Sequence, residues 1–307
     1  MEKNSLKAWL YLLPAIIFLG VFLVYPLIDV LIYSFEEGFN FAAQDFMGYG
    51  TYNYSYVLRD PYFIAALRNT LILVFITVPV STGLALLISL GLSSIEKLRN
   101  LFQTVYFLPY VTNSIAIGIV FAAMFTMSTV KNNGETIIVT AGIINDIIGV
   151  FGVKPIDWLG PQSTYAQNMF VMVVYIVWNA LPFKILILLG GLQSVNKQYY
   201  DAAKVDGTSK VRTFTRITVP LLSPMIAYVI ITGFIGGFKE YTSIVGVFGE
   251  SMGPTGDAYR LNTMVGYIYK YITQHQGRAS AAALILFGII FVVTLINLKV
   301  SSKKTQY

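Results

Sequence analysis

The sequence predicts an all-α polytopic membrane protein with six transmembrane helices and both termini in the cytoplasm. Charged residues make up 12% of the chain and hydrophobic residues 56%, whereas soluble domains carry about 25% charged residues. Several apolar runs exceed the roughly 20 residues that a helix needs to cross a bilayer. Isolated strands cannot satisfy their backbone in lipid, and no alternating pattern typical of a barrel repeats, so we predict these runs as helices.

Six apolar runs are long enough to cross a bilayer, and the whole chain, residues 1–307, is predicted to form a single transmembrane domain. The first run is too long for a signal peptide, and no small-residue cleavage site follows it, so we expect it to remain as a helix. The predicted spans lie at about residues 9–35, 64–92, 101–127, 165–192, 219–248 and 279–300.

A shorter run at residues 136–152 is predicted as an amphipathic helix on the membrane surface, because Asn145 and Asp146 lie near its middle. With the N-terminus inside, most lysines and arginines fall in short cytoplasmic segments, as the distribution of positive charge in membrane proteins requires. A seventh span would move the most basic loop outside. The orientation therefore explains the net charge of +6, and no nucleic-acid partner is expected.

The residue types that catalytic and metal sites commonly use are scarce. The chain has no cysteine and one histidine, His275, which excludes disulfides, thiolate ligands and cysteine nucleophiles. The predicted spans contain no paired carboxylates and no clear inverted repeat of the kind that secondary transporters carry. We therefore expect neither a metal site nor a catalytic residue.

The loop at about residues 193–218 concentrates lysine, arginine and aspartate between two apolar runs. Asn196 is a predicted helix N-cap and Gly207 a predicted left-handed C-terminal residue, so a short helix is predicted between them. Ala202 and Ala203 leave a shallow face that another surface can approach closely. An ordinary basic cytoplasmic loop is the alternative interpretation, because positive charge is the default on that side of a membrane.

The spacing of residues in this loop resembles the EAA loop of bacterial ABC importer permeases. That motif reads Glu-Ala-Ala, three residues, Gly, nine residues and Ile-x-Leu-Pro. Here Asp201 replaces the glutamate and Val219 the leucine, and every gap is kept. In that family the helix, here residues 196–207, docks on a cytoplasmic ATPase subunit and couples its closure to rocking of the spans. The residues expected to take part in this coupling are Asp201, Ala202, Ala203, Asp206, Gly207, Ile217 and Pro220.

The similarity extends over nearly the whole chain and points to sugar-importer permeases of the maltose-transporter and glycerol-phosphate-transporter type. Residues 66–74, "ALRNTLILV", and residues 277–287, "GRASAAALILF", fit that group. The first span fits the first of its two permease types. The resemblance implies the fold of an ABC type I importer permease in a bacterial cell membrane. As function, it implies the uptake of a carbohydrate, and an oligosaccharide is expected.

The same resemblance implies the partners of the chain. They are a second homologous permease, two ATP-binding cassette subunits, an extracytoplasmic solute-binding protein, the carbohydrate and the lipid bilayer. No Walker A sequence occurs in the chain, so ATP and Mg²⁺ are expected on the ATPase subunits. We expect no cofactor on this chain, and a transport subunit and not an enzyme.

In the maltose-type permeases, the spans on either side of the coupling loop line the sugar pocket. Counting along the ungapped match gives Asn179, Ala180 and Phe183 before the loop. The maltose-type pocket has amides where this chain has Gly237 and Glu240, so maltose bound in the same way is not expected. The residues expected to bind the solute are Trp178, Asn179, Phe183, Gly233, Gly237, Lys239, Glu240 and Tyr241.

Lys184, Lys239 and Glu240 lie within predicted apolar spans, where each charge costs at least ~2.5–3.5 kcal/mol on insertion scales. One interpretation is that Glu240 accepts hydrogen bonds from solute hydroxyls while an aromatic side chain supports the sugar ring. The other is an interhelical or intersubunit ion pair with a lysine. The glycines at residues 233–237 also fit close helix packing across the interface with the second permease. Within the family the alternative solute is a polyol phosphate or a peptide, and a secondary transporter is the more distant alternative.

Overall fold

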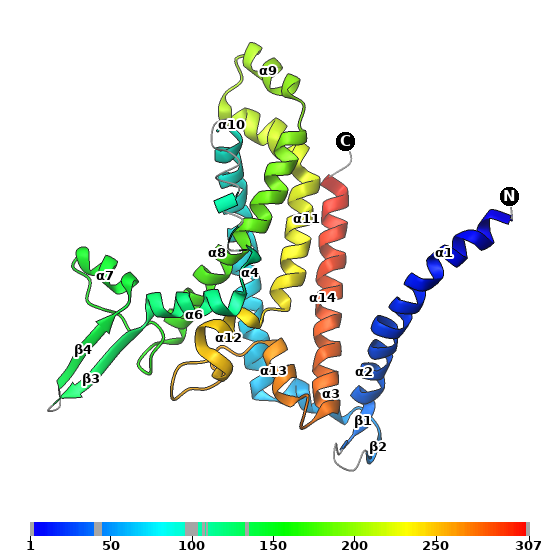
Figure 1. The fold of residues 1–307 in the computed structure, drawn as a ribbon, viewed down its shortest axis with the longest axis vertical. Coiled ribbons are helices and arrows are strands. Elements are labelled where there is room, and N and C mark those ends of the chain that lie inside the picture. The colour runs from blue at the N-terminus through cyan, green and yellow to red at the C-terminus, as the bar shows by residue number, and fades with distance from the viewer. Residues whose placement is uncertain are drawn as a thin grey trace. The chain divides into compact units, whose positions relative to one another are not determined.

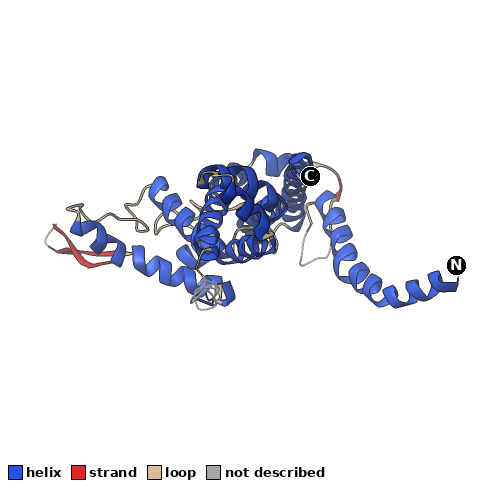
Figure 2. Cartoon of the chain, turned by 90° about the horizontal axis from the view of Figure 1, so that it is seen from above, coloured by secondary structure: helices blue, strands red, loops and turns tan. Residues whose placement is uncertain are grey.

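The structure is a computed structural model that describes residues 3–39, 45–95, 104–105, 108, 110–132 and 135–304. The described chain is mostly helical, with two antiparallel hairpins (Figure 2). Among the described residues, five helices are long and apolar enough to cross a membrane. These are Trp9–Phe35, Pro61–Ser93, Tyr165–Ser194, Lys210–Phe238 and Gln276–Ser301.

Four of these helices coincide with spans predicted from the sequence, and the fifth is displaced along the chain. The remaining predicted span, residues 101–127, begins outside the described residues. Its described C-terminal part contains α6 (Ser114–Phe125), an apolar helix of 12 residues.

The described chain divides into two compact units, and each unit is built from two separate segments of the sequence. The first combines Met1–Ile64 with Met264–Gly288. In it the hydroxyl of Tyr267 donates to the Asp60 carboxylate at 2.7 Å. Its elements are α1 (Lys3–Leu19), the π turn η1 (Gly20–Val24), α2 (Tyr25–Phe35), β1 (Glu36–Glu37), β2 (Gly48–Tyr49), α3 (Tyr52–Arg59), α13 (Met264–Tyr271) and the start of α14 (Gln276–Lys304).

The second unit combines Ala65–Thr263 with Ile289–Tyr307 and carries the candidate site. One of its hydrophobic clusters packs α8 (Tyr165–Ser194) against α4 (Pro61–Ser93) and α12 (Thr242–Phe248) around Leu73 and Tyr175. The other packs α8 against α4 and α11 (Val219–Phe238) around Leu188. Its elements are α4 (Pro61–Ser93), α6, β3 (Met127–Asn132), β4 (Glu135–Ala141), α7 (Ile143–Val150), α8 (Tyr165–Ser194), α9 (Lys197–Val205), α10 (Lys210–Thr213), the π turn η2 (Phe214–Thr218), α11 (Val219–Phe238), α12 (Thr242–Phe248) and the 3-10 turn η3 (Gly249–Ser251), with the end of α14 (Figure 1).

The β3–β4 hairpin corrects the prediction of an all-α chain and of a helix over residues 136–152. β3 and β4 pair antiparallel, and only the second half of the predicted helix, α7, is helical. The run Thr-Ile-Ile-Val-Thr at the start of β4 is entirely β-branched, which favours a strand. Asn145 is buried and its carboxamide bonds both backbone groups of Ile156 at 3.0 Å, so it fastens α7 to the following loop.

The fifth predicted span, residues 219–248, is also corrected at both ends. The helical run begins at Lys210, continues through η2 into α11 and stops at Phe238, before the separate helix α12. The stop has a local cause: Glu240 Oε1 accepts a hydrogen bond from Ser243 N in the first turn of α12 at 3.1 Å, and a carboxylate there satisfies an otherwise free backbone donor. Lys239 and Glu240 therefore lie in a break between helices and not within a continuous span.

Candidate functional site

A cavity of about 290 Å³ lies among α4, α8 and α11 of the second unit. From α8 it is lined by residues at positions 176, 179, 180, 183 and 184, a spacing that places them on one face of a helix. The cavity brings together five of the residues predicted to bind the solute: Asn179, Phe183, Gly233, Gly237 and Glu240. It adds lining residues that the sequence prediction did not assign to solute binding, among them Thr77, Ser81, Tyr110, Lys184 and Thr232.

Three of the residues predicted to bind solute lie outside this cavity. Trp178 is on another face of α8 and packs on Phe121 with ring centroids 5.3 Å apart. Lys239 is exposed at the C-terminal end of α11. Tyr241 packs against the hydrophobic cluster of α8 and α12. The remaining cavity residues therefore carry the candidate site.

Aromatic rings form one wall of the cavity. Phe183 and Tyr110 stack with centroids 5.7 Å apart and an interplanar angle of 18°. Tyr228 lies tilted against the Phe183 ring at 6.4 Å. A planar apolar surface beside hydrogen-bonding groups suits a ligand with an apolar face and polar edges.

The two charged residues that line the cavity do not pair with each other. Lys184 Nζ donates to three oxygens of α4, and Glu240 Oε1 accepts from Ser243 N. Ion pairs elsewhere in the described residues include Lys204–Asp201 and Arg260–Asp257. Among the described residues, Glu240 is therefore bonded to Ser243 N and not to Lys184, and an ion pair with a partner subunit stays a prediction.

The glycines of α11 allow close packing against α4 and α8. A Cβ at Gly233 would lie 3.1 Å from Val78 Cγ1 and 3.2 Å from Lys184 Nζ, and one at Gly237 would lie 3.1 Å from Val74 Cγ2. These are closer than nearly all real Cβ contacts. These two glycines thus pack closely within the chain and also line the cavity, while packing across the permease interface stays a prediction.

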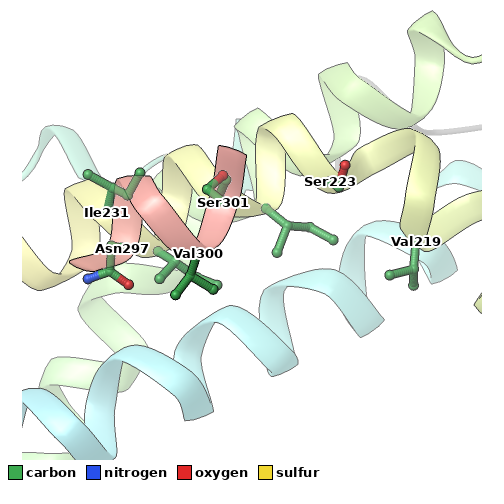
Figure 3. Close-up of a pocket in the computed structure, with 9 residues that line it drawn as sticks. Val219, Ser223, Ile231, Asn297, Val300 and Ser301 are labelled. Atoms are coloured by element: carbon green, nitrogen blue, oxygen red, sulfur yellow. The ribbon is translucent and has the colours of Figure 1, made fainter. Parts of the chain in front are cut away.

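A second cavity, of about 230 Å³, lies between α11 and the end of α14 (Figure 3). Its lining is mostly apolar, and the Asn297 amide donates to Val293 O of its own helix at 3.0 Å. The labelled lining residues are Val219, Ser223, Ile231, Asn297, Val300 and Ser301. Without a charged side chain in its lining, it suits an apolar occupant and not a polar solute.

The predicted short helix of the loop after α8 is confirmed as α9. The Asn196 side chain accepts a hydrogen bond from Gln198 N at 3.0 Å, as an N-cap does. Gly207 has φ +64°, and Thr208 N donates to Ala203 O at 2.9 Å, which closes the C-terminal end. The local geometry expected from the sequence is therefore present.

The exposed face of α9 differs from the prediction in one respect. Ala203 is 5% exposed and turns into the chain, while Ala202 is exposed. Asp201 and Lys204 form an exposed ion pair at 3.2 Å, and Val205 is 88% exposed. Of the other predicted coupling residues, Asp206, Gly207 and Pro220 are exposed and Ile217 is half-buried. Ala202 is thus the one of the two alanines that the surface of α9 presents to a partner, with carboxylates and the exposed Val205 beside it.

Comparison with known proteins places the chain in a family. It matches the binding-protein-dependent transport system inner membrane component family over residues 81–306. It is 34% identical to the arabinooligosaccharides transport system permease protein AraP of Bacillus subtilis (strain 168), over 95% of this chain and 88% of that protein. It is 31% identical to the lactose transport system permease protein LacF of Rhizobium radiobacter, over 96% of this chain and 95% of that protein.

The fold has a solved counterpart as well. A bacterial ABC transporter involved in the import of the acidic polysaccharide alginate contains a chain of the same fold, with a TM-score of 0.76 and 20% identity. The match covers 99% of this chain and 98% of that chain. Together with the apolar spans, these matches show that the protein is a multi-pass membrane protein that belongs to the binding-protein-dependent transport system inner membrane components.

Proposed function

We propose that the chain is the transmembrane permease subunit of an ABC importer that takes up a carbohydrate, with an oligosaccharide as the expected solute. The observation that carries the proposal is the cavity among α4, α8 and α11, where the Glu240 carboxylate and the stacked Tyr110 and Phe183 rings meet. A carboxylate accepts hydrogen bonds from sugar hydroxyls, and an aromatic ring supports the apolar face of a sugar. The names of the relatives, which transport arabinooligosaccharides and lactose, support the same solute class.

The cavity argues against a phosphorylated solute. Among the described lining residues Lys184 is the one cation, and its ammonium donates to α4 oxygens. A phosphate group binds best where several charged donors converge on it. We therefore do not expect uptake of a polyol phosphate. The uptake assay tests this solute and the peptide directly.

In the proposed assembly, a second homologous permease completes the translocation path, and two ATPase subunits dock beneath through α9. An extracytoplasmic binding protein delivers the solute. The capped geometry of α9 and its exposed Asp201, Ala202 and Asp206 support the docking role. Six spans and cytoplasmic termini belong to the same proposal, as does the absence of a cofactor on this chain.

The first experiment is a gentle detergent pull-down of the tagged chain from its native membrane, followed by mass spectrometry. We expect a second permease, an ATPase and a solute-binding protein to be recovered with it. Proteoliposomes of the recovered complex would then be offered arabino-oligosaccharides, lactose, glycerol phosphate and a short peptide. Recovery of the chain alone, or ATP-dependent uptake of the peptide and of no sugar, would overturn the proposal.

Topology can be tested directly because the chain has no cysteine. In intact cells, a membrane-impermeant maleimide should label Lys154→Cys, while Lys7→Cys and Lys299→Cys should react only after lysis. Labelling of Lys7→Cys in intact cells would contradict the cytoplasmic N-terminus.

A further inference from the structure

The cavity between α11 and the end of α14 changes in polarity along its length (Figure 3). Ser223 and Ser301 line the half near the start of α11, and the rest is lined mainly by the isoleucines at positions 226, 230 and 231. The amide of Asn297, which also lines the cavity, donates within its own helix. From Val219 to Ile231 the α11 wall is about 18 Å long, at about 1.5 Å per residue.

Positive charge lies just beyond the end of the cavity that Ser223 and Ser301 line. Arg216 is in the π turn η2, less than one helical turn before Val219, and its side chain is exposed. No carboxylate of the described residues pairs with it. The other wall, α14, ends with Lys304, one turn after Ser301. Because a long arginine side chain can extend along its helix, the order of groups along the cavity is cation, hydroxyl, hydrocarbon.

The place of the cavity in the chain limits what can occupy it. α11 and the end of α14 both belong to helices that are long and apolar enough to cross a membrane, so lipid hydrocarbon surrounds the isoleucine part. A sugar would find few partners there for its hydroxyls. An apolar helix of a partner subunit would leave the Ser223 hydroxyl without an acceptor, and that hydroxyl makes no hydrogen bond to the described residues.

A phospholipid carries its groups in the same order as the cavity. Its phosphate pairs with an arginine, its glycerol ester oxygens accept hydrogen bonds from a hydroxyl, and its acyl chain is apolar. Basic pockets between membrane helices are known to bind anionic lipid head groups. A net negative head group is favoured here over a zwitterionic one, because Arg216 has no carboxylate beside it that could hold the cationic part.

We propose that this cavity is a binding site for an anionic phospholipid. The phosphate pairs with Arg216, the glycerol esters lie at Ser223, and one acyl chain lies between α11 and α14 along Ile226 and Ile230. None of these residues lines the cavity among α4, α8 and α11. The site therefore goes beyond the proposed import of a carbohydrate, and it requires only that the chain lies in a membrane.

The first test labels the site with a lipid probe. The purified protein, with the subunits that copurify, is placed in phosphatidylcholine vesicles that contain phosphatidylglycerol with a photoactivatable diazirine on its acyl chain. After illumination, peptides that contain residues 219–231 and 297–301 should carry several-fold more label than α1, whose apolar residues are exposed all round. Excess unlabelled phosphatidylglycerol should compete this label away, and excess phosphatidylcholine should not. Label no higher than on α1, or equal competition by both lipids, would overturn the proposal.

The second test counts the lipid that stays bound after delipidation, by native mass spectrometry. Arg216→Gln should lower retained phosphatidylglycerol about fivefold, the contribution of one cation near an anionic head group. Lys210→Gln is the matched control, because Lys210 is exposed and begins the same helical run about 9 Å farther from the cavity. It should retain the wild-type amount, and equal retention in Arg216→Gln and wild type would refute the head-group contact.

Filling the cavity tests the place of the acyl chain. Ala227 lines the cavity, so Ala227→Phe should reduce retained lipid several-fold, and Ala227→Leu is the milder variant if the phenylalanine prevents assembly. Leu221→Phe adds bulk at an exposed position of α11 outside the lining and should change nothing. Full retention in the filled variants would place the lipid elsewhere.

A partner helix is the competing occupant, and it gives a different result. Val300 is exposed at the cavity and the chain has no cysteine, so a benzophenone maleimide can be attached at Val300→Cys alone. We expect its photoproduct to be a lipid adduct. A cross-link to a second protein subunit would show that a helix covers the cavity and would overturn the lipid site. These measurements use no carbohydrate, so their failure and the failure of the proposed import function are distinguishable.

Discussion

Replacing Gly207 with valine should uncouple ATP hydrolysis from solute import. Gly207 has φ +64° and ends α9. A residue with a Cβ adopts this left-handed conformation at a cost of about 1–2 kcal/mol, more for a β-branched side chain. A Cβ at this position would meet nothing within 4 Å, so the penalty comes from the backbone and not from a clash.

The strain can be relieved only by opening the end of α9. That would release two hydrogen bonds, from Gly207 N to Lys204 O at 3.1 Å and from Thr208 N to Ala203 O at 2.9 Å. A penalty of about 1–2 kcal/mol lowers the population of the closed end roughly 5–30-fold relative to the opened one. We therefore expect Gly207→Val to reduce solute imported per ATP hydrolysed by a factor in that range, with normal membrane insertion.

The assay is simultaneous measurement of ATP hydrolysis and solute uptake in proteoliposomes. Gly207→Asn is the matched control at the same site, because asparagine tolerates the left-handed region. Gly149→Val makes the same chemical change on the exposed helix α7, again with nothing within 4 Å of the new Cβ. Both controls should keep the wild-type ratio, and an unchanged ratio in Gly207→Val would refute the role given to α9.

Three further predictions concern the cavity, helix packing and pH. Glu240→Gln should raise KM for a neutral sugar by about tenfold, because an amide accepts hydrogen bonds less strongly than a carboxylate. Gly118→Ala should lower Tm, since its Cβ would lie 2.6 Å from the Cα of Gly246 and overpacking costs about 1–3 kcal/mol, whereas Gly91→Ala, with nothing within 4 Å, should not. Burial raises the pKa of the Glu36 carboxyl, so folding favours its protonated form and the penalty of its charge fades as pH falls through the raised pKa. Glu36→Gln should therefore raise Tm at pH 7.5, and the gain should shrink toward pH 5.

The measurements for these predictions are KM from solute-stimulated ATP hydrolysis and thermal unfolding of the purified complex. A drop in yield with unchanged KM in Glu240→Gln would favour an intersubunit ion pair over solute binding. Equal Tm shifts for the two alanine variants would contradict the close approach of α6 and α12. A Tm gain in Glu36→Gln that is constant from pH 5 to 8 would show that the charge of this carboxyl is not the cause.

The long helices were predictable because length and apolarity suffice to define a membrane span. The hairpin at β3 and β4 was missed although its signal was present, since an unbroken β-branched run at residues 136–140 favours a strand more than a helix. The break after Phe238 had a weaker local signal, a glutamate three residues before Ser243 that can cap a new helix. It also depends on a tertiary contact, in which the Thr263 hydroxyl donates to the Glu240 carbonyl at 2.7 Å.

Only part of the lining of the cavity could be predicted from the sequence, because the contacts between its helices are tertiary. Its α8 wall follows from helical periodicity, which would also have excluded Trp178. Its α4 wall had a weaker signal, the polar pair Thr77 and Ser81 one turn apart in an apolar helix. The bonding of Lys184 to that wall could not be predicted, because a sequence does not show which helix faces which.

The positions of α9 and the cavity suggest how the two sites communicate. α9 follows α8 directly, and the cavity residues of α8 end at Lys184, about 20 Å along the axis from the start of α9. On the other side, α9 connects through α10 and the π turn η2 to α11, which carries Gly233 and Gly237 near its far end, and Glu240 follows in the break after it. A displacement of α9 therefore acts on α8 and α11, two of the three helices that wall the cavity. Because Lys184 ties α8 to α4, the two helices should move together, while α11, which meets them through glycines and has a π turn at its base, is the wall that is free to shift.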